Sequence, residues 1–350
     1  MEQRYCGNSD FKLSVIGAGC WSFGGGDYWG PLDQQDATKI VHCSVELGIN
    51  YFDTAEAYND GRSEQALGEA LKGINRESVV IGTKVSPSNC YPDTLAAHCH
   101  GSLQRLSTDY IDLYMIHWPL HSHAVRHFTD NEDIINNPPS VSDAFETLVK
   151  LRDAGKIRHI GVSNFAPIRL DESRQFCDQI VVNQLAYNIL ARAIEFEVLD
   201  YCKNYAVSVI GYSTLLQGVL ADVYPALSDV PKWQRRTRHF HHASCDLSRH
   251  GEAGAEEETV KALEDIRSIA RDSGITVPDL ALKWAIAQEG IACSLVGTRS
   301  VQRLESNVRA AEEPLPAEII EKLNAVTDPL KEKMGPSFDY FESAANDRTR

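Results

Sequence analysis

The run Gly48-Ile49-Asn50-Tyr51-Phe52-Asp53-Thr54-Ala55-Glu56-Ala57-Tyr58 decides the fold. Its apolar part, residues 49–52, predicts a short buried strand that ends in an acid, with a phenol beyond the strand end. The next apolar strand along the chain ends in Lys84, and the strand after that ends in His117. Polar side chains that follow the carboxyl ends of successive strands are typical of a parallel α/β barrel.

Strand and helix patterns alternate along the rest of the chain. Strands are predicted at 15–19, 49–52, 79–83, 111–116, 157–162, 179–183, 207–211 and 291–296. Helices are predicted at 32–47, from 63 to about 71, 92–106, 141–154, near 167, and at 195–205, 256–272, 277–288, 301–311 and 316–326. Near-continuous apolar strands separated by helices indicate a parallel sheet that is covered on both faces.

This alternation predicts one (β/α)8 TIM barrel domain over residues 1–350. The barrel is expected at about 15–312, after a β-hairpin at 3–14, and residues 313–350 add a helix and a tail. Long loops are expected at 119–140 and 215–254, and an irregular tail from Lys331. An open doubly wound sheet is the alternative architecture.

Composition limits the partners of the chain. It has 34 basic and 49 acidic residues, and a formal net charge of -15 disfavours nucleic acid and anionic membranes as partners. Nine scattered cysteines without a C-x-x-C motif are interpreted as reduced thiols. We see no signal-peptide core and no apolar run long enough for a membrane helix. We therefore expect a cytoplasmic protein; its oligomeric state is not readable.

Asp53, Tyr58, Lys84 and His117 form a candidate proton-transfer site. A phenol is a poor acid at neutral pH, and a nearby cation lowers its pKa. Lys84 is the expected cation, Asp53 would hold it, and His117 would donate a hydrogen bond to a substrate oxygen. Together they would protonate an oxygen that becomes negative as hydride reaches its carbon, or act in reverse. Each of these residues, taken alone, could have a purely structural role, such as an ion pair inside the barrel. Their shared position at the carboxyl ends of successive strands favours a catalytic role.

Longer motifs make the chain resemble the aldo-keto reductase superfamily over nearly its whole length. The motifs are Gly48-x-Asn50-x-x-Asp53-Thr54-Ala55-x-x-Tyr58, Thr83-Lys84, Ile116-His117-Trp118-Pro119, the run 155–165 and Gly297-Thr298-Arg299. The resemblance implies a (β/α)8 barrel and a nicotinamide cofactor. It implies that Tyr58 is the general acid/base, that Lys84 and Asp53 tune it, and that His117 orients the substrate.

A cofactor site is expected at the later strand ends. Ser163, Asn164 and Gln184 offer a hydroxyl and amides for the nicotinamide carboxamide, and Tyr212 offers a face for the ring. The segment after Tyr212 would wrap the pyrophosphate. The predicted cofactor contacts are Cys20, Trp21, Asp53, Ser163, Asn164, Gln184, Tyr212, Ser213, Leu215, Gly218, Gly297, Thr298, Arg299, Arg303 and Asn307.

The adenine end of the cofactor is expected at a helix that follows Gly297-Thr298-Arg299. A helix N-terminus suits a phosphate, and guanidinium groups such as those of Arg299 and Arg303 are the usual partners of a 2'-phosphate. The sequence therefore favours NADP(H) over NAD(H). Asn307 matches the family, whereas Ser306 stands where the family usually carries Glu or Gln. The alternative for Arg303 is a solvated helix charge.

The glycine-rich segment near the N-terminus is not a dinucleotide fingerprint. In Gly17-x-Gly19 the third glycine is replaced by Ser22, and an aromatic loop follows in place of a helix. Aromatic side chains near the predicted site are expected to wall a pocket for a sugar or another carbonyl compound. They are Trp21, Tyr28, Trp29 and Trp118. The alternative is that this loop only packs on the barrel.

Two histidine clusters, at 121–127 and 239–242, lack the cysteine or carboxylate pattern of a zinc site. We interpret both as surface loops and predict no metal. The basic run 235–239 either folds over the cofactor phosphates or is a solvated loop.

The leading functional hypothesis is an NADP(H)-dependent oxidoreductase acting on an aldehyde, a ketone or a sugar. One competing class is a cofactor-bound regulatory subunit, because channel β-subunits share this barrel. A metal-dependent barrel hydrolase is the other. The presence of all four catalytic residues disfavours the first, and the absence of a metal-ligand pattern disfavours the second. The substrate and the physiological direction cannot be read from the sequence.

Overall fold

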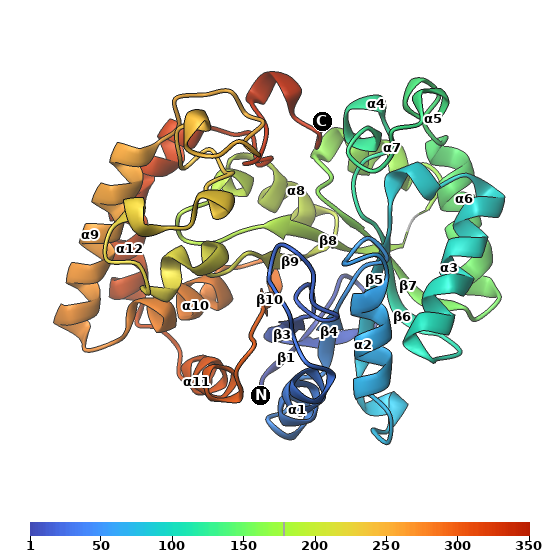
Figure 1. Cartoon of the computed structure of the whole chain (residues 1–350), viewed down its shortest axis with the longest axis horizontal. Coiled ribbons are helices and arrows are strands. Elements are labelled where there is room, and N and C mark those ends of the chain that lie inside the picture. Colours follow the sequence, from blue (N-terminus) through green and yellow to red (C-terminus); the bar gives the residue numbers. More distant parts are fainter. Residues whose placement is uncertain (178) are drawn as a thin grey trace.

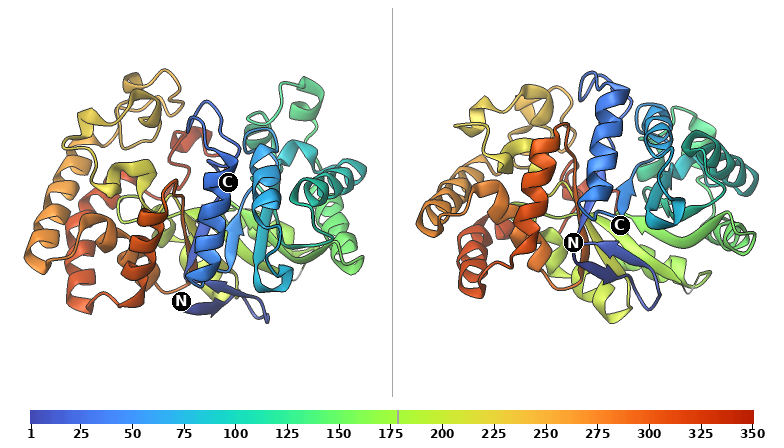
Figure 2. Two further views of the ribbon diagram at one scale, coloured as in Figure 1. Left: turned by 60° about the horizontal axis from the view of Figure 1, so that its bottom comes forward. Right: turned by 90° about the horizontal axis from the view of Figure 1, so that it is seen from below.

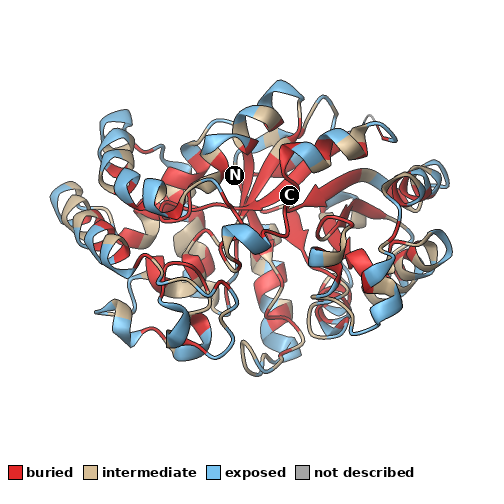
Figure 3. Cartoon of the chain, turned by 90° about the horizontal axis from the view of Figure 1, so that it is seen from above, coloured by how far each residue is buried: buried red, intermediate tan, exposed pale blue. Residues whose placement is uncertain are grey.

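A closed barrel of parallel strands forms the centre of the computed structural model, which describes residues 1–177 and 179–350. Among these residues, eight strands follow one another in the order β10-β3-β4-β5-β6-β7-β8-β9. Seen from above, the strands at the centre are mostly buried (Figure 3). They are β3 (Ile16–Gly19), β4 (Tyr51–Asp53), β5 (Val80–Val85), β6 (Ile111–Ile116), β7 (Ile157–Ser163), β8 (Ile180–Ala186), β9 (Ser208–Tyr212) and β10 (Ile291–Val296). The predicted TIM barrel is confirmed and the open sheet is excluded.

Helices surround the strands, as Figure 1 shows. They are α1 (Gln34–Glu46), α2 (Arg62–Ala70), α3 (Pro92–Leu106), α6 (Val141–Asp153), α7 (Pro167–Arg174), α8 (Val198–Asn204), α9 (Glu256–Ser273), α10 (Val277–Ala287), α11 (Val301–Glu312) and α12 (Ala317–Met334). Several begin at a side-chain cap: Asp33 accepts from Gln35 N, and Ser140 accepts from Asp143 N. Such caps satisfy amide groups that have no partner within the helix.

A β-hairpin covers the amino end of the barrel (Figure 2). Its strands β1 (Gln3–Tyr5) and β2 (Lys12–Ser14) pair antiparallel. Phe11 and Leu13 pack on barrel side chains such as Tyr51. Because this end is covered, the chemistry is expected at the opposite, carboxyl end of the strands.

Gly17 makes room for a large side chain inside the barrel. A Cβ atom on Gly17 would lie 2.7 Å from the ring of Tyr51, and one on Gly82 would lie 2.4 Å from its hydroxyl oxygen. Both glycines therefore serve the packing of Tyr51. This explains in physical terms why Gly17-x-Gly19 is not a phosphate loop.

Three local predictions were wrong. The expected loop at 119–140 contains the short helices α4 (Ser122–Val125) and α5 (Glu132–Asn136). The helix expected at 195–205 is divided into the 3₁₀ turn η3 (Ala193–Phe196) and α8. Helix α12 continues past Lys331 to Met334, because Leu330 and Met334 are both buried on its inner face.

Two segments lie above the carboxyl end of the barrel, the loop 215–254 and the tail 335–350 (Figure 1). The loop contains the 3₁₀ turns η4 (Leu216–Ala221), η5 (Leu227–Asp229), η6 (Lys232–Gln234) and η7 (His242–Ser244), and the tail contains η8 (Ala344–Asn346). No helix in the described residues is both long enough and apolar enough to cross a bilayer.

Candidate active site

A buried lysine joins two of the predicted catalytic residues. Lys84 Nζ, completely buried, donates to Asp53 Oδ1 at 2.7 Å and lies 3.3 Å from the Tyr58 hydroxyl oxygen. Pairing of β4 with β5 sets Asp53 opposite Gly82, so the two strand ends lie side by side. Burial opposes the charge of Lys84, but Asp53 and Tyr58 outweigh it and raise the pKa of the ammonium above its usual value. Lys84 is therefore charged at neutral pH.

Asp53 is occupied by protein donors. Besides Lys84, its carboxylate accepts from the Tyr51 hydroxyl at 3.0 Å and from Gln184 Nε2 at 2.7 Å. It is buried, at 3% exposed. These contacts suit a residue that holds Lys84 in place.

Burial raises the pKa of Tyr58 above its usual value, and the Lys84 charge reduces that rise without reversing it. The lowering by Lys84 expected from the sequence is present, but desolvation is the larger effect. The phenol is therefore protonated at neutral pH and can donate a proton.

His117 follows β6 and faces Tyr58. The two rings meet edge to face, with centroids 5.6 Å apart. Burial, followed by the charges of Lys84 and Arg348, holds the pKa of His117 well below its usual value. The ring is neutral at neutral pH, and its buried Nδ1 has no hydrogen-bond partner in the part of the chain that the structure describes. A neutral imidazole beside a phenol can donate a hydrogen bond to a substrate oxygen.

The ends of β7, β8 and β9 form one polar network. Ser163 Oγ donates to Gln184 O at 3.0 Å, and Asn164 Nδ2 donates to Ser163 Oγ at 3.0 Å. The Tyr212 hydroxyl donates to Asn164 Oδ1 at 2.8 Å. Gln184 also contacts Asp53, so the predicted nicotinamide residues adjoin the proton-transfer residues.

The segment after β9 bends through left-handed backbone conformations. Ser213, Leu216, Gln217 and Gly218 have φ values of 56°, 42°, 52° and 103°. Leu216, Gln217 and Gly218 are consecutive, so right- and left-handed residues do not alternate there. The contact of this segment with the pyrophosphate stays a prediction.

The N-terminus of α11 lies against the aromatic loop. Gly297 approaches Gly19 of β3, and Thr298 Oγ1 accepts from Ser300 N at 3.1 Å. Arg299 is not free: it donates to Trp29 O at 2.5 Å and also to Pro31 O.

Arg303 and Asn307, one turn apart on α11, share a helix face. Arg303 is exposed. Of the two predicted 2'-phosphate ligands, Arg303 is therefore the more available one.

Aromatic side chains of the loop 20–31 form a cluster next to Tyr58. The Trp21 ring stacks on Tyr28 at 5.0 Å and lies 5.8 Å from the Tyr58 ring. Trp29 meets the edge of Tyr28 at 4.9 Å. The sequence reasoning missed Trp233, which meets Tyr28 at 4.8 Å from the loop 215–254. Nothing in local sequence pairs residues this far apart.

Trp118 lies apart from this cluster, beneath the C-terminal tail. The Arg348 guanidinium carbon is 3.8 Å from its ring centroid, and Trp118 is 7% exposed. Arg348 donates to both carboxylate oxygens of Asp339, at 2.6 and 2.7 Å, and both residues are buried. Ala166 N donates to Thr349 O at 3.0 Å, which fixes the tail to the end of β7. The sequence reasoning missed this role of the tail.

The family follows from a comparison with known proteins. A model described as "Aldo/keto reductase family" matches residues 15–328. The chain belongs to the aldo/keto reductase family.

Individual relatives agree with this assignment. The chain is 31% identical over 332 residues to an "NADH-specific methylglyoxal reductase" of Escherichia coli (strain K12), a match covering 89% of this chain and 93% of the relative. A thermostable aldo-keto reductase solved with the inhibitor epalrestat has a TM-score of 0.72 and 25% identity, covering 93% of this chain and 100% of that one. An aldo/keto reductase from Klebsiella pneumoniae, solved with NADP and acetate, has a TM-score of 0.67 and 26% identity, covering 90% of this chain and 92% of that one.

His239 of this aldo/keto reductase is not on the surface, so the surface-loop interpretation was wrong for it. Its ring is completely buried, with Nε2 2.9 Å from Leu190 O and Nδ1 3.0 Å from Thr237 Oγ1. His121 is also engaged, because its Nε2 lies 2.9 Å from Arg348 O. The described residues contain no group of three or more His, Cys, Asp or Glu side chains placed to hold a metal.

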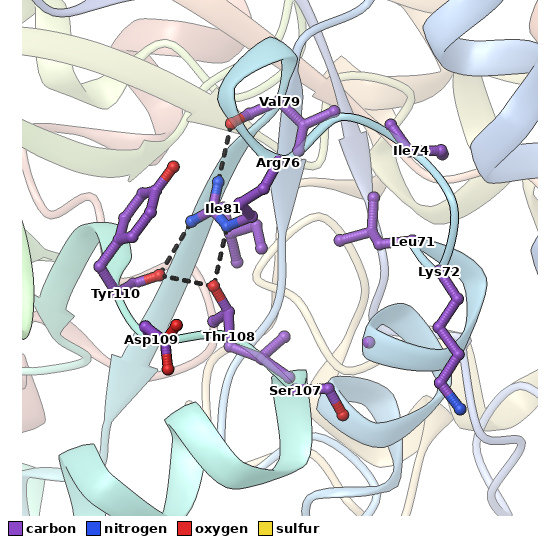
Figure 4. Close-up of a pocket in the computed structure, with 12 residues that line it drawn as sticks. Leu71, Lys72, Ile74, Arg76, Val79, Ile81, Ser107, Thr108, Asp109 and Tyr110 are labelled. Carbon is purple, nitrogen blue, oxygen red and sulfur yellow. Dashed lines mark hydrogen bonds between the residues drawn. The ribbon is translucent and has the colours of Figure 1, made fainter.

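A cavity of about 260 Å³ lies at the other end of the barrel (Figure 4). Arg76 crosses it and donates to Thr108 Oγ1, Val79 O and Tyr110 O, each at 2.9 Å. Because it adjoins the amino ends of β5 and β6, this cavity is remote from Lys84 and His117, which lie toward the carboxyl ends. We assign it no role in the reaction.

Proposed function

We propose that this aldo/keto reductase reduces an aldehyde or ketone to an alcohol, or catalyses the reverse, with Tyr58 as general acid/base. The observation that carries the proposal is the buried contact of Lys84 with both Asp53 and Tyr58, at 2.7 and 3.3 Å. A buried cation beside a phenol stabilises the phenolate that remains after proton donation.

The residues divide the chemistry among them. The cofactor would supply the hydride. Tyr58 donates its proton to the substrate oxygen, and neutral His117 donates a hydrogen bond to the same oxygen. Lys84 offsets the charge left on Tyr58, and Asp53 keeps Lys84 charged and fixed.

We propose NADP(H) as the preferred cofactor. Ser163, Asn164 and Gln184 would hold the nicotinamide amide, and Tyr212 would lie against its ring. The left-handed segment after Tyr212 would hold the pyrophosphate, and exposed Arg303 would meet the 2'-phosphate. A relative solved with NADP is consistent with this choice, while the NADH-specific relative from Escherichia coli makes the preference a point to test.

The substrate is proposed to be a small carbonyl compound, sugar-derived carbonyls included. Methylglyoxal is a reasonable first probe, because the named relative reduces it. We further propose a cytoplasmic location, supported by the eight cysteines other than Cys177, none of which forms a disulfide. We also propose that residues 1–350 form a single domain, because the tail packs on the strand ends of the barrel.

Replacement of Tyr58 by Phe tests the proposal. We expect kcat to fall by about 10²- to 10⁴-fold, because proton donation is lost. Affinity for NADPH, measured by calorimetry, should stay within about twofold, since the general acid serves the substrate and not cofactor binding. Tyr5→Phe, at an exposed position on the hairpin, is the matched control. A Tyr58→Phe enzyme with wild-type turnover would overturn the assignment.

A further inference from the structure

Arg236 is a cation without a carboxylate partner in the loop above the barrel mouth. The other arginines of this loop are neutralised or bonded within the described structure. Arg235 donates to Val230 O and Ser228 O at 2.6 Å each. Arg238 pairs with Glu252 at 2.8 Å, and Arg249 pairs with Glu342.

Arg236 contacts aromatic side chains instead of an anion, and its guanidinium also hydrogen-bonds to the Tyr28 hydroxyl. Its guanidinium carbon lies 4.5 Å from the ring centroid of Tyr28 and 5.5 Å from that of Phe341. Its Nε is buried and has no hydrogen-bond partner among the described residues. Rings that lie over a guanidinium leave its other in-plane N–H groups available, and a carboxylate or phosphate can accept hydrogen bonds from them.

Two aromatic rings connect Arg236 to the candidate active site. Tyr28 stacks on Trp21 at 5.0 Å, and the Trp21 ring lies 5.8 Å from Tyr58. A short chain of ring contacts therefore leads from the guanidinium to the proton donor. In a protein with a formal net charge of -15, a cation held here without an anion is poised for a negatively charged ligand.

We propose that Arg236 binds an anionic group, carboxylate or phosphate, of the carbonyl substrate. The inference rests on the proposed function and narrows it: the reductase would prefer carbonyl compounds that carry a negative charge away from the reacting carbon. Arg348 does not compete for this role, because the Nε–Nη2 edge of its guanidinium already binds Asp339 with two hydrogen bonds.

The test compares Arg236→Gln with the wild type on matched substrates at saturating NADPH. The pairs are succinic semialdehyde with butanal, and D-glyceraldehyde 3-phosphate with D-glyceraldehyde. We expect kcat/KM for an anionic member to fall about 10- to 100-fold, the loss expected for a charge-assisted hydrogen bond. The neutral members should change by less than about threefold, and Arg236→Lys should recover part of the loss. Arg235→Gln is the matched control, since Arg235 bonds to backbone carbonyls.

Two outcomes would overturn the inference. An equal loss on charged and neutral substrates, together with weaker NADPH binding in calorimetry, would assign Arg236 to the cofactor pyrophosphate. Unchanged kinetics on every substrate would remove any anion-binding role.

The same experiment distinguishes failure of the anion-site inference from failure of the proposed function. If the wild-type enzyme reduces butanal, the proposed function is supported, whatever the kinetics of Arg236→Gln. If the wild type reduces no carbonyl, calorimetry of succinate with cofactor-loaded protein tests the anion site directly. Binding that Arg236→Gln weakens at least tenfold would support the site, and equal or absent binding would reject it.

Discussion

At the scale of single residues, the candidate active site depends on how buried charges are balanced. Lys84 could not stay charged in the barrel without Asp53, and Asp53 is held by three side-chain donors, from Tyr51, Lys84 and Gln184. Tyr51 also packs on the hairpin at the far end of the barrel. The proton-transfer residues are therefore held in place by contacts with the barrel core. Their other side faces the carboxyl end of the barrel.

Arg303 is the residue on which cofactor preference is expected to depend. Arg303→Ala should weaken NADPH binding by about 10- to 100-fold, because charge-assisted hydrogen bonds to the 2'-phosphate would be lost. NADH binding should change by less than about twofold. Fluorescence titration with both cofactors measures this, and Arg309→Ala, exposed on the same helix, is the control. A similar loss for both cofactors would show that Arg303 does not read the 2'-phosphate.

At the scale of elements, the tail 335–350 is held by a buried ion pair. Asp339→Asn should leave the Arg348 charge without its counterion, a change that costs about 3–5 kcal/mol for a buried pair. Because the tail lies on the surface of the barrel, we expect it to detach before the barrel unfolds. Limited chymotrypsin digestion should then cleave at Phe338, Tyr340 or Phe341 faster than in the wild type.

The double variant Asp339→Asn/Arg348→Met is the informative control for the tail. It removes both charges, so the tail should be more resistant to chymotrypsin than in Asp339→Asn alone. Equal digestion rates for the wild type and Asp339→Asn would mean that the ion pair does not hold the tail.

The loop 215–254 is expected to make the protein sensitive to acid through His239. Burial lowers the pKa of His239 to about 4 in the folded chain, whereas an unfolded histidine titrates near 6.5. The unfolded chain therefore binds the extra proton between these values. The contribution to stability is complete above pH 6.5 and is lost as the pH falls toward 4, roughly 3 kcal/mol in all.

Urea unfolding at pH 7 and pH 4.5 measures this acid sensitivity. His239→Gln keeps a donor for Leu190 O but cannot titrate, so its stability should fall less between the two pH values. His100→Gln, at an exposed position on α3, should behave like the wild type. If His239→Gln loses as much stability as the wild type, another group is responsible.

At the scale of the whole molecule, sequence reasoning predicted the barrel and the positions of Asp53, Lys84 and His117. Both follow from local patterns, because apolar strands alternate with amphipathic helices and each polar side chain lies at or directly after the carboxyl end of its strand. The mouth was not predictable in the same way. Contacts such as Tyr28 with Trp233, or Trp118 with Arg348, join loops about 200 residues apart, and no periodicity encodes them.

Substitutions at the amino end of the barrel should therefore change stability without changing activity. Phe11 is 6% exposed and stacks on His159 at 4.4 Å beneath the barrel, so Phe11→Ala should reduce the free energy of unfolding by about 3–5 kcal/mol. Since the proton-transfer residues lie at the opposite end of the barrel, kcat at room temperature should stay within about twofold of the wild-type value. Tyr5→Ala, on the same hairpin but 60% exposed, should cost less than about 1 kcal/mol. A large loss of kcat in folded Phe11→Ala protein would mean that the hairpin affects Asp53 through Tyr51. The two ends of the barrel would then be energetically coupled.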